Sequence, residues 1–258
     1  MKLKNILASV AMAAATTAAM ASPINVGGVT WDPDSPFDFF AKGNLFETVV
    51  DLSNGGFQGY GIATNINEAN EQSFCTNCEL TFTFGGFTLT GGTLVNPIFS
   101  GGFINFYVQD KSAAGFTAYN ALNGMTTGGD GTLWLGLTGH AETRASGTGT
   151  LFASVDSGIL GSGNERGAGG GLFDVTSGLA AGNFNTNTLM DSQGNFADIN
   201  FSSSFQPTRA TAIAGGAFAL SGTGEIVGNS IPEPGSLALL GLGLAGLGFA
   251  KRRKNLAK

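Results

Sequence analysis

Short runs of alternating apolar and polar residues dominate the middle of the chain. In the clearest run, Leu80, Phe82 and Phe84 fall on one face and threonines on the other, and the pattern resumes at Phe87 after a pair of glycines. Successive side chains of a β-strand point to opposite faces, so this period of two predicts a half-buried strand.

Five further segments combine short length with β-branched or aromatic residues and are bounded by Gly, Asn, Asp or Ser, which favours strands. They are residues 103–108, 132–138, 150–155, 197–205 and 217–227. No long apolar stripe with helical period separates them. We therefore predict an all-β fold, a single antiparallel β-sandwich or jelly-roll-like domain. The glycine-rich segment 156–171 is predicted to be a long mobile loop.

The glycine content is high for a packed fold, with 42 glycines among the 258 residues. A flexible low-complexity chain is the alternative that such a content raises. However, 21 phenylalanines and the alternating runs supply enough apolar surface for a core. Gly-Gly-Phe recurs at residues 55, 85 and 101 without a fixed period, so a solenoid is not indicated.

The N-terminus has the three parts of a secretory signal peptide. Lys2 and Lys4 form a charged start, residues 6–15 are apolar, and small residues ending at Ala21 precede Ser22. We predict cleavage between Ala21 and Ser22, which makes residues 1–21 a signal peptide and places the mature protein outside the cytoplasm.

The C-terminus has another ordered pattern: Pro232-Glu233-Pro234, an apolar run over residues 236–250, and Lys251-Arg252-Arg253-Lys254. This order resembles the PEP-CTERM sorting signal of Gram-negative bacteria. The resemblance covers about a tenth of the chain. It implies that residues 231–258 are a sorting signal and that residues 22–230 are the exported domain. It also implies processing at the tripeptide by an exosortase, an inner-membrane transpeptidase-like enzyme.

The physical properties of the tail agree with transient membrane insertion. Fifteen helical residues span about 22 Å, which is less than the roughly 30 Å of a bilayer's hydrocarbon core. The positive-inside rule would keep the four consecutive cations in the cytoplasm and leave the tripeptide at the outer surface. An ordinary single-span membrane anchor is the alternative.

Removal of both signals makes the protein strongly acidic. Seventeen of the 18 acids but only five of the 12 bases lie in residues 22–231, which gives a formal net charge of −12. Nucleic acid is excluded as a partner, since phosphate binding depends on clustered Lys and Arg. We expect exosortase, signal peptidase and, transiently, the inner membrane as export partners. Extracellular polysaccharide, bridged to the protein by divalent cations, is the expected final partner.

The chain offers few residues for redox or acid-base chemistry. Cys75 and Cys78 are its only cysteines, and an exported context predicts a local disulfide between them. A thioredoxin-type role is disfavoured because the pair leads into a strand rather than a helix. His140 is the only histidine; we interpret it as a partly exposed residue at a strand end, with general-base catalysis as the alternative.

Asp32, Asp34 and Asp38 place three carboxylates within seven residues beside aromatic side chains. They are a candidate for part of a Ca²⁺ site, which needs six to eight oxygen ligands. The alternative is that Asp and Pro simply form turns there. Apart from this speculative Ca²⁺ we expect no cofactor.

The sequence thus favours a non-enzymatic, exported surface or extracellular-matrix protein with a structural or adhesive role. The family resemblance implies an association with exopolysaccharide and with biofilm or floc formation. A secreted carbohydrate-binding module with a defined glycan ligand is the first alternative, and an extracellular hydrolase is the second.

Overall fold

The structure, a computed structural model, describes residues 22–208 and 218–231. These residues form mostly β-strands with three short helices. The helices are α2 (Glu71–Phe74), α3 (Gly124–Thr127) and α4 (Ala181–Phe184). The strands are β1 (Ile24–Val26), β2 (Val29–Trp31), β3 (Phe39–Glu47), β4 (Gly56–Ile66), β5 (Ala69–Asn70), β6 (Cys78–Gly92), β7 (Pro97–Asp110), β8 (Thr132–Gly139), β9 (Glu142–Arg144), β10 (Gly147–Gly149), β11 (Leu151–Ser157), β12 (Arg166–Ser177), β13 (Leu189–Met190), β14 (Phe196–Ala197), β15 (Ile199–Pro207) and β16 (Leu220–Gly228).

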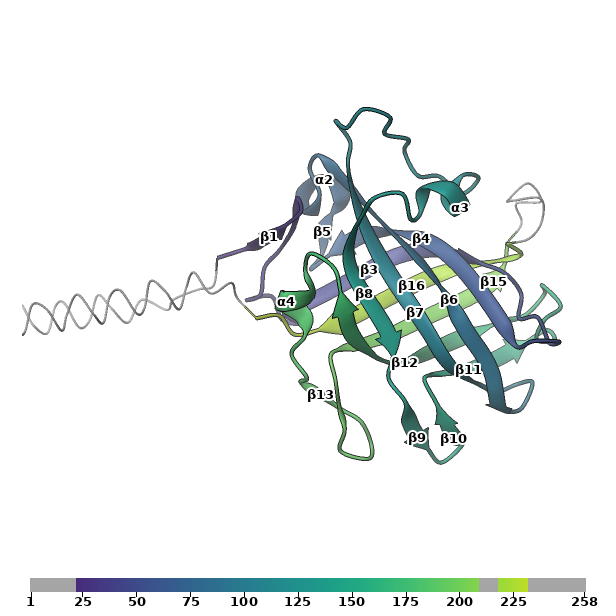
Figure 1. The fold of residues 1–258 in the computed structure, drawn as a ribbon. Helices are drawn as coiled ribbons and strands as arrows, with labels where there is room; N and C mark the ends of the chain where they lie inside the picture. The colour runs from purple at the N-terminus through teal and green to yellow at the C-terminus, as the bar shows by residue number, and fades with distance from the viewer. Residues whose placement is uncertain (1–21, 209–217, 232–258) are drawn as a thin grey trace, which may run out of the picture.

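Eight antiparallel strands form a sheet that closes on itself into a barrel, in the order β12-β15-β16-β3-β4-β6-β7-β8 (Figure 1). Pairing of β8 with β12 closes the sheet, and β11 pairs with both β7 and β12 beyond the end of β8. The predicted all-β, antiparallel class is therefore confirmed. A single closed sheet encloses the core in place of two separate packed sheets. Closure pairs the two edge strands with each other, so the backbone groups of neither edge are left without partners.

The alternating runs occupy strands as predicted. Leu80, Phe82 and Phe84 are buried on β6, whose hydrogen-bonded neighbours are β4 and β7. The other five predicted segments lie within or overlap β7, β8, β11, β15 and β16. The alternation of apolar and polar residues predicted these strands correctly, because their apolar side chains point into the barrel interior and their polar side chains face solvent.

Three core strands, β3, β4 and β12, were missed by the pattern because glycines replace inward-facing large residues. Gly59 of β4 is paired with Phe84 of β6, and Gly61 is paired with Phe82. A Cβ atom at either glycine would overlap the facing phenyl ring. The abundance of glycine and the abundance of phenylalanine are therefore linked, since the absent side chain of one residue provides the space for the ring of the other.

The prediction of a loop over residues 156–171 was wrong for its second half. β11 ends at Ser157 and β12 begins at Arg166, so only the residues between them form the connection. Residues 167–171 pair with β15 along the barrel wall. A glycine-rich composition is typical of loops, but strands pair through backbone N–H and C=O groups, which glycine also has.

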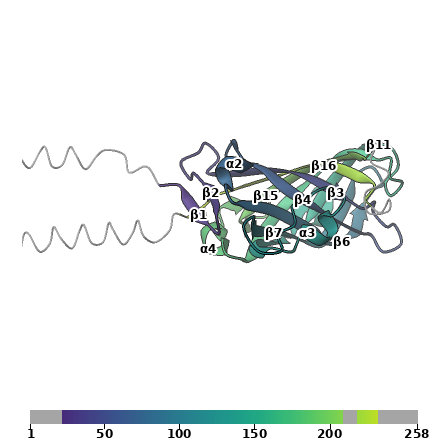
Figure 2. The ribbon, with the colours of Figure 1, turned by 90° about the horizontal axis from the view of Figure 1, so that it is seen from above.

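The two ends of the barrel differ in structure. β1, β2 and α4 gather at one end, which we call the stem end, and β11 lies toward the opposite, distal end (Figure 2). The stem end is filled by an aromatic cluster of Trp31, Phe39, Trp134 and Phe184, with ring centroids 4.5 to 6.2 Å apart. Trp31 and Phe39 are thus core residues.

The distal half of the barrel interior holds a cavity of about 50 Å³. It is lined mainly by apolar side chains, among them Phe57, Phe99 and Leu160, and also by Glu47 and Glu165. Within residues 22–208 and 218–231, no helix has the length and apolar character needed to cross a membrane. The predicted apolar tail, residues 236–250, lies outside the described residues.

Candidate functional site: the barrel end that precedes the sorting tail

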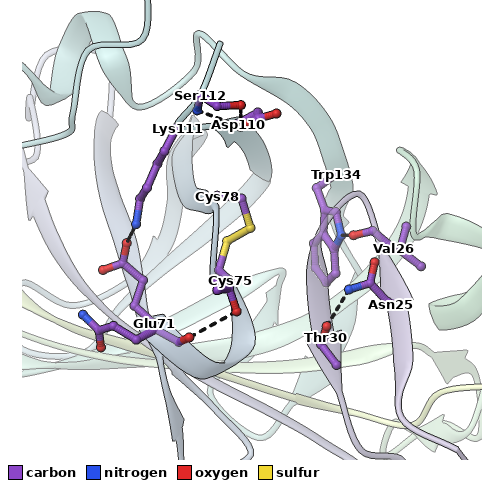
Figure 3. Close-up of a disulfide and its surroundings, with 12 residues drawn as sticks. Asn25, Val26, Thr30, Glu71, Cys75, Cys78, Asp110, Lys111, Ser112 and Trp134 are labelled. Carbon is purple, nitrogen blue, oxygen red and sulfur yellow. Dashed lines mark hydrogen bonds and ion pairs between the residues drawn. A yellow bond between two sulfur atoms is a disulfide. The ribbon is translucent and has the colours of Figure 1, made fainter.

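Cys75 and Cys78 form the predicted disulfide, which joins the end of α2 to the start of β6 (Figure 3). Both cysteines are buried. Lys111 at the end of β7 makes an ion pair with Glu71 of α2, 2.5 Å between Nζ and Oε1, and supports the same corner. No free thiol remains in the described chain. The bridge therefore stabilises a corner of the barrel next to β1 and β2.

Two of the three candidate calcium ligands, Asp32 and Asp38, accept hydrogen bonds from other residues of the chain. Asp32 Oδ1 accepts a hydrogen bond from the backbone N of Asp34, at 2.9 Å, as in an Asx turn. Asp38 directs both carboxylate oxygens toward a different segment, at Ser230. Within the described chain no three His, Cys, Asp or Glu residues form a group that would hold a metal ion. The structure therefore does not bring these carboxylates together as a ligand set.

Asp38 instead clamps the end of the described chain to the barrel. Its Oδ1 accepts a hydrogen bond of 2.6 Å from Ser230 Oγ, and its Oδ2 accepts one of 2.8 Å from Ser230 N. Ser230 Oγ also accepts a bond of 3.0 Å from Trp31 Nε1. These contacts join β2, the turn before β3 and the C-terminal segment. Hydrogen bonds to a charged group each contribute about 1.5–3 kcal/mol, so the clamp is a strong local constraint.

Two further residues, Asn183 and Thr188, hold the same C-terminal segment, residues 229–231, which we call the stem. Asn183 of α4 accepts a backbone hydrogen bond from Ile231 N at 2.8 Å, and its Nδ2 donates to Ile231 O at 3.2 Å. Asn229 Nδ2 donates to Thr188 Oγ1 at 2.8 Å. Every residue of the stem is thus hydrogen-bonded to the segments that cover the stem end of the barrel, up to the residue that directly precedes Pro232.

The turn that carries Asp38 is itself fixed. Asp38 has a positive φ of 57°, a conformation that Asp and Asn tolerate better than most residues. Asn67 Nδ2 donates to the Asp38 carbonyl at 2.7 Å and to the Asp32 carbonyl at 2.9 Å, while Asn67 Oδ1 accepts from Phe40 N at 2.8 Å. The carboxylate is therefore oriented before it meets Ser230. Sequence spacing did not reveal this contact, because Asp38 and Ser230 are 192 positions apart.

His140 lies just beyond β8 and is mostly buried. Its Nδ1 is 3.0 Å from both carboxylate oxygens of Asp174, and its Nε2 is 3.6 Å from Asp191 Oδ2. Nε2 has no hydrogen-bond partner. In the part of the chain that the structure describes, no hydroxyl or thiol is hydrogen-bonded to this imidazole. The residue joins β8, β12 and the turn between β13 and β14.

Two carboxyl groups meet at the distal cavity. Glu165 is fully buried, and its Oε1 accepts a hydrogen bond of 3.0 Å from Gly161 N. Burial raises the pKa of Glu47 from 4.5 to about 8, and the negative charge of Glu165 adds to this increase. Glu47 is therefore a carboxyl group that favours its neutral form near physiological pH.

A surface groove of about 680 Å³ runs over the distal half of the outer wall. The turn between β6 and β7 and the β9–β10 hairpin border it, and β11, β12 and β15 form its floor. Arg144 is the only charged residue that lines it. No local sequence pattern indicates this groove, since its lining comes from five separate segments.

Comparison with known families gives one result. Residues 230–254 match the PEP-CTERM protein-sorting motif, a range that includes Pro232, Glu233, Pro234 and the basic residues Lys251, Arg252, Arg253 and Lys254. These residues, like Ala21 of the predicted signal-peptide cleavage site, lie outside the described residues, whereas Ser22 is exposed at their start. No curated protein and no solved structure matches the chain.

The fold and the matched motif define an all-β protein that is exported to the cell surface with a C-terminal sorting signal. The chain contains a PEP-CTERM protein-sorting motif at residues 230–254, and this motif implies processing by exosortase.

Proposed function

We propose that this protein is a structural or adhesive component of the extracellular matrix, with a role in biofilm or floc formation. The observation that carries the proposal is the clamped stem. Residues 229–231 are hydrogen-bonded to the barrel and lead directly into the PEP tripeptide. Such a stem holds the barrel close to the site of processing, where a flexible tether would let it swing freely.

The sorting step is tested by replacing Pro232, Glu233 and Pro234 together with Ala. If exosortase recognises the tripeptide, the variant precursor stays in the inner membrane with its tail uncut, and the parent protein is released at lower mass. Cell fractionation and intact-mass analysis measure both. Equal release and equal mass for parent and variant would refute recognition of these residues.

The matrix role is tested by retention of the exported protein in the matrix. The mature segment has a formal net charge of −12, so we expect divalent cations to bridge its carboxylates to anionic polysaccharide through many weak contacts. Millimolar Ca²⁺ should increase retention and chelation should release the protein. A monovalent salt of equal ionic strength should increase retention less than Ca²⁺ does, because it screens charge but does not coordinate carboxylates. Equal effects of the two salts would contradict bridging.

The structure changes how the local calcium hypothesis is tested. Replacing Asp38 would also break the clamp at Ser230, so the informative variant is Asp32→Asn with Asp34→Asn and an intact Asp38. A decrease in calcium-dependent retention would support a role for this turn. Unchanged retention would assign bridging to carboxylates elsewhere.

A secreted carbohydrate-binding module is the second candidate, and the groove beside Arg144 favours it. Saturable binding of one glycan by the exported protein would separate it from a matrix protein that binds weakly and only with divalent cations. Turnover of the glycan would instead favour the third candidate, an extracellular hydrolase, with His140 and Asp174 as the first residues to replace.

A further inference from the structure

We propose that the groove beside Arg144 is a binding site for a uronate-containing glycan, with the Arg144 guanidinium as the group that binds the uronate carboxylate. The proposal rests on the carbohydrate-associated function above and names the ligand class and the residues. It differs from calcium bridging, because the cation that binds the carboxylate belongs to the protein.

Arg144 is held in one orientation by a buried carboxylate. Its Nε and Nη2 donate to Glu142 Oε2 at 3.0 and 2.8 Å, and Glu142 is 8% exposed. The guanidinium carbon lies 4.0 Å from the centroid of the Phe152 ring, a cation–π arrangement. A planar guanidinium fixed on two sides loses little further conformational entropy when it binds a carboxylate.

The guanidinium keeps binding capacity. Within the described chain Nη1 makes no hydrogen bond, and 41% of the side chain remains exposed. An arginine has five N–H donors in a planar fork, so the outer donors match the two oxygens of a carboxylate. Glu142 thus orients Arg144 without using all its donors.

The hairpin that carries Arg144 is also fixed from behind. Thr143 N donates to Gln193 Oε1 at 2.8 Å, and Ser192 Oγ donates to Thr143 O at 2.8 Å. Asp191, at the base of the same turn, accepts from Gln193 N at 2.8 Å. Arg144 therefore projects from a braced two-stranded hairpin, and the groove wall is formed before any ligand arrives.

The rest of the groove matches a sugar chain. Exposed hydroxyl and amide groups line it, and the partly exposed ring of Phe152 adds apolar surface. Sugars present hydroxyl edges and apolar C–H faces, so they need both kinds of contact. The polar lining residues include Thr93, Asn96, Ser146, Ser154 and Ser202. No Asp or Glu lines the groove itself, although the mature segment carries 17 acids. Two carboxylates lie next to the lining: Glu142, which is paired with Arg144, and Asp156, whose Oδ1 accepts a hydrogen bond of 3.2 Å from Ser154 Oγ.

The test is binding of oligogalacturonate to the exported, processed protein in the presence of EDTA, measured by calorimetry. A neutral maltooligosaccharide of equal length is the ligand control. We expect Arg144→Gln to weaken oligogalacturonate binding at least about tenfold, as the loss of a charge-assisted hydrogen bond requires. Lys42→Gln is the matched control, because Lys42 is 44% exposed and also paired with a glutamate. It should leave affinity unchanged.

A second pair of variants tests whether a bulky side chain inside the groove blocks ligand binding. Ser202→Tyr places a ring in the groove, whereas Asn200→Tyr places one on the same strand and the same face outside the lining. Only the first should block binding. Equal losses from Arg144→Gln and Lys42→Gln, equal binding of the neutral sugar, or no binding in EDTA would each overturn the proposal. If calcium-dependent matrix retention persists after such a result, the proposed function stands and the groove assignment alone fails.

Discussion

The two ends of the barrel use buried polar groups in opposite ways. At the stem end, both oxygens of Asp38 are hydrogen-bonded to Ser230 and the indole nitrogens of Trp31 and Trp134 both have acceptors. At the distal end, Glu47 and Glu165 line a small apolar cavity, and the pKa of Glu47 is raised by burial and by its neighbour's charge. The stem end is filled by an aromatic cluster, while the distal end holds a cavity and two carboxyl groups close to one another.

This difference follows from what each end must do. The stem end holds residues 229–231, which directly precede Pro232 in the sequence. The distal end has no chain terminus to hold, and its loops are free to carry a cavity and a groove. Polar groups with matched partners stabilise an end, whereas like-charged carboxyl groups in apolar surroundings make its stability depend on pH.

The largest change in the free energy of unfolding should come from replacing a core phenylalanine with alanine, and we compare this change at the two ends of the barrel. Phe184→Ala removes a fully buried ring from the stem-end cluster and should lower the free energy of unfolding by about 4 kcal/mol. Phe57→Ala, the matched change beside the distal cavity, should lower it by only about 2 kcal/mol, since that ring is partly exposed. Urea denaturation measures both. Equal losses would contradict the difference in packing.

The clamp should contribute the next largest amount. Asp38→Asn keeps the side-chain shape and tolerates the positive φ, but it replaces one acceptor oxygen by an amide. We expect a loss of about 2 kcal/mol and increased proteolysis near residue 230. Asp34→Asn, in the same turn, is the control and should change stability by less than about 0.5 kcal/mol. Retained protection of the stem in Asp38→Asn would show that Asn183 suffices to hold it.

The distal carboxyl pair should make stability decrease as pH rises. The folded pKa of Glu47, about 8, exceeds its ordinary value of 4.5, so the folded state binds a proton that the unfolded state releases between these values. Stability is thus fully retained below about pH 4.5 and is lost as pH rises toward 8. Glu47→Gln should stabilise the protein by roughly 1–3 kcal/mol at pH 9 and by little at pH 4. Glu68→Gln, at an exposed position, should show no such dependence.

The smallest effect should come from the disulfide. Replacing Cys75 and Cys78 together with Ala removes a bridge between residues only three positions apart, which restricts little unfolded-chain entropy. We expect a loss of about 2 kcal/mol or less. Alkylation of the parent protein without reductant, followed by mass analysis, should show no free thiol. Unfolding of the double variant at room temperature would show that the bridge supports more than a local corner.

The sequence anticipated the features that depend on neighbouring residues. Alternation at Leu80, Phe82 and Phe84 identified a strand because side-chain direction follows from local backbone geometry. The spacing of Cys75 and Cys78 and the exported context were enough to predict their bridge. Pro232 to Pro234, with the apolar run and cations that follow, identified the sorting signal, since such a motif is a linear pattern.

Only the tertiary structure decided the features that join distant parts of the chain. Closure of the sheet requires β8 to pair with β12, and Gly59 and Gly61 are strand residues because Phe84 and Phe82 occupy their missing side-chain volume. The contact between Asp38 and Ser230 is of the same kind, because the two residues are 192 positions apart. Linear patterns report local geometry and motifs, whereas packing volumes, hydrogen-bond partners and the pKa of Glu47 are properties of surroundings that exist only after the chain has folded.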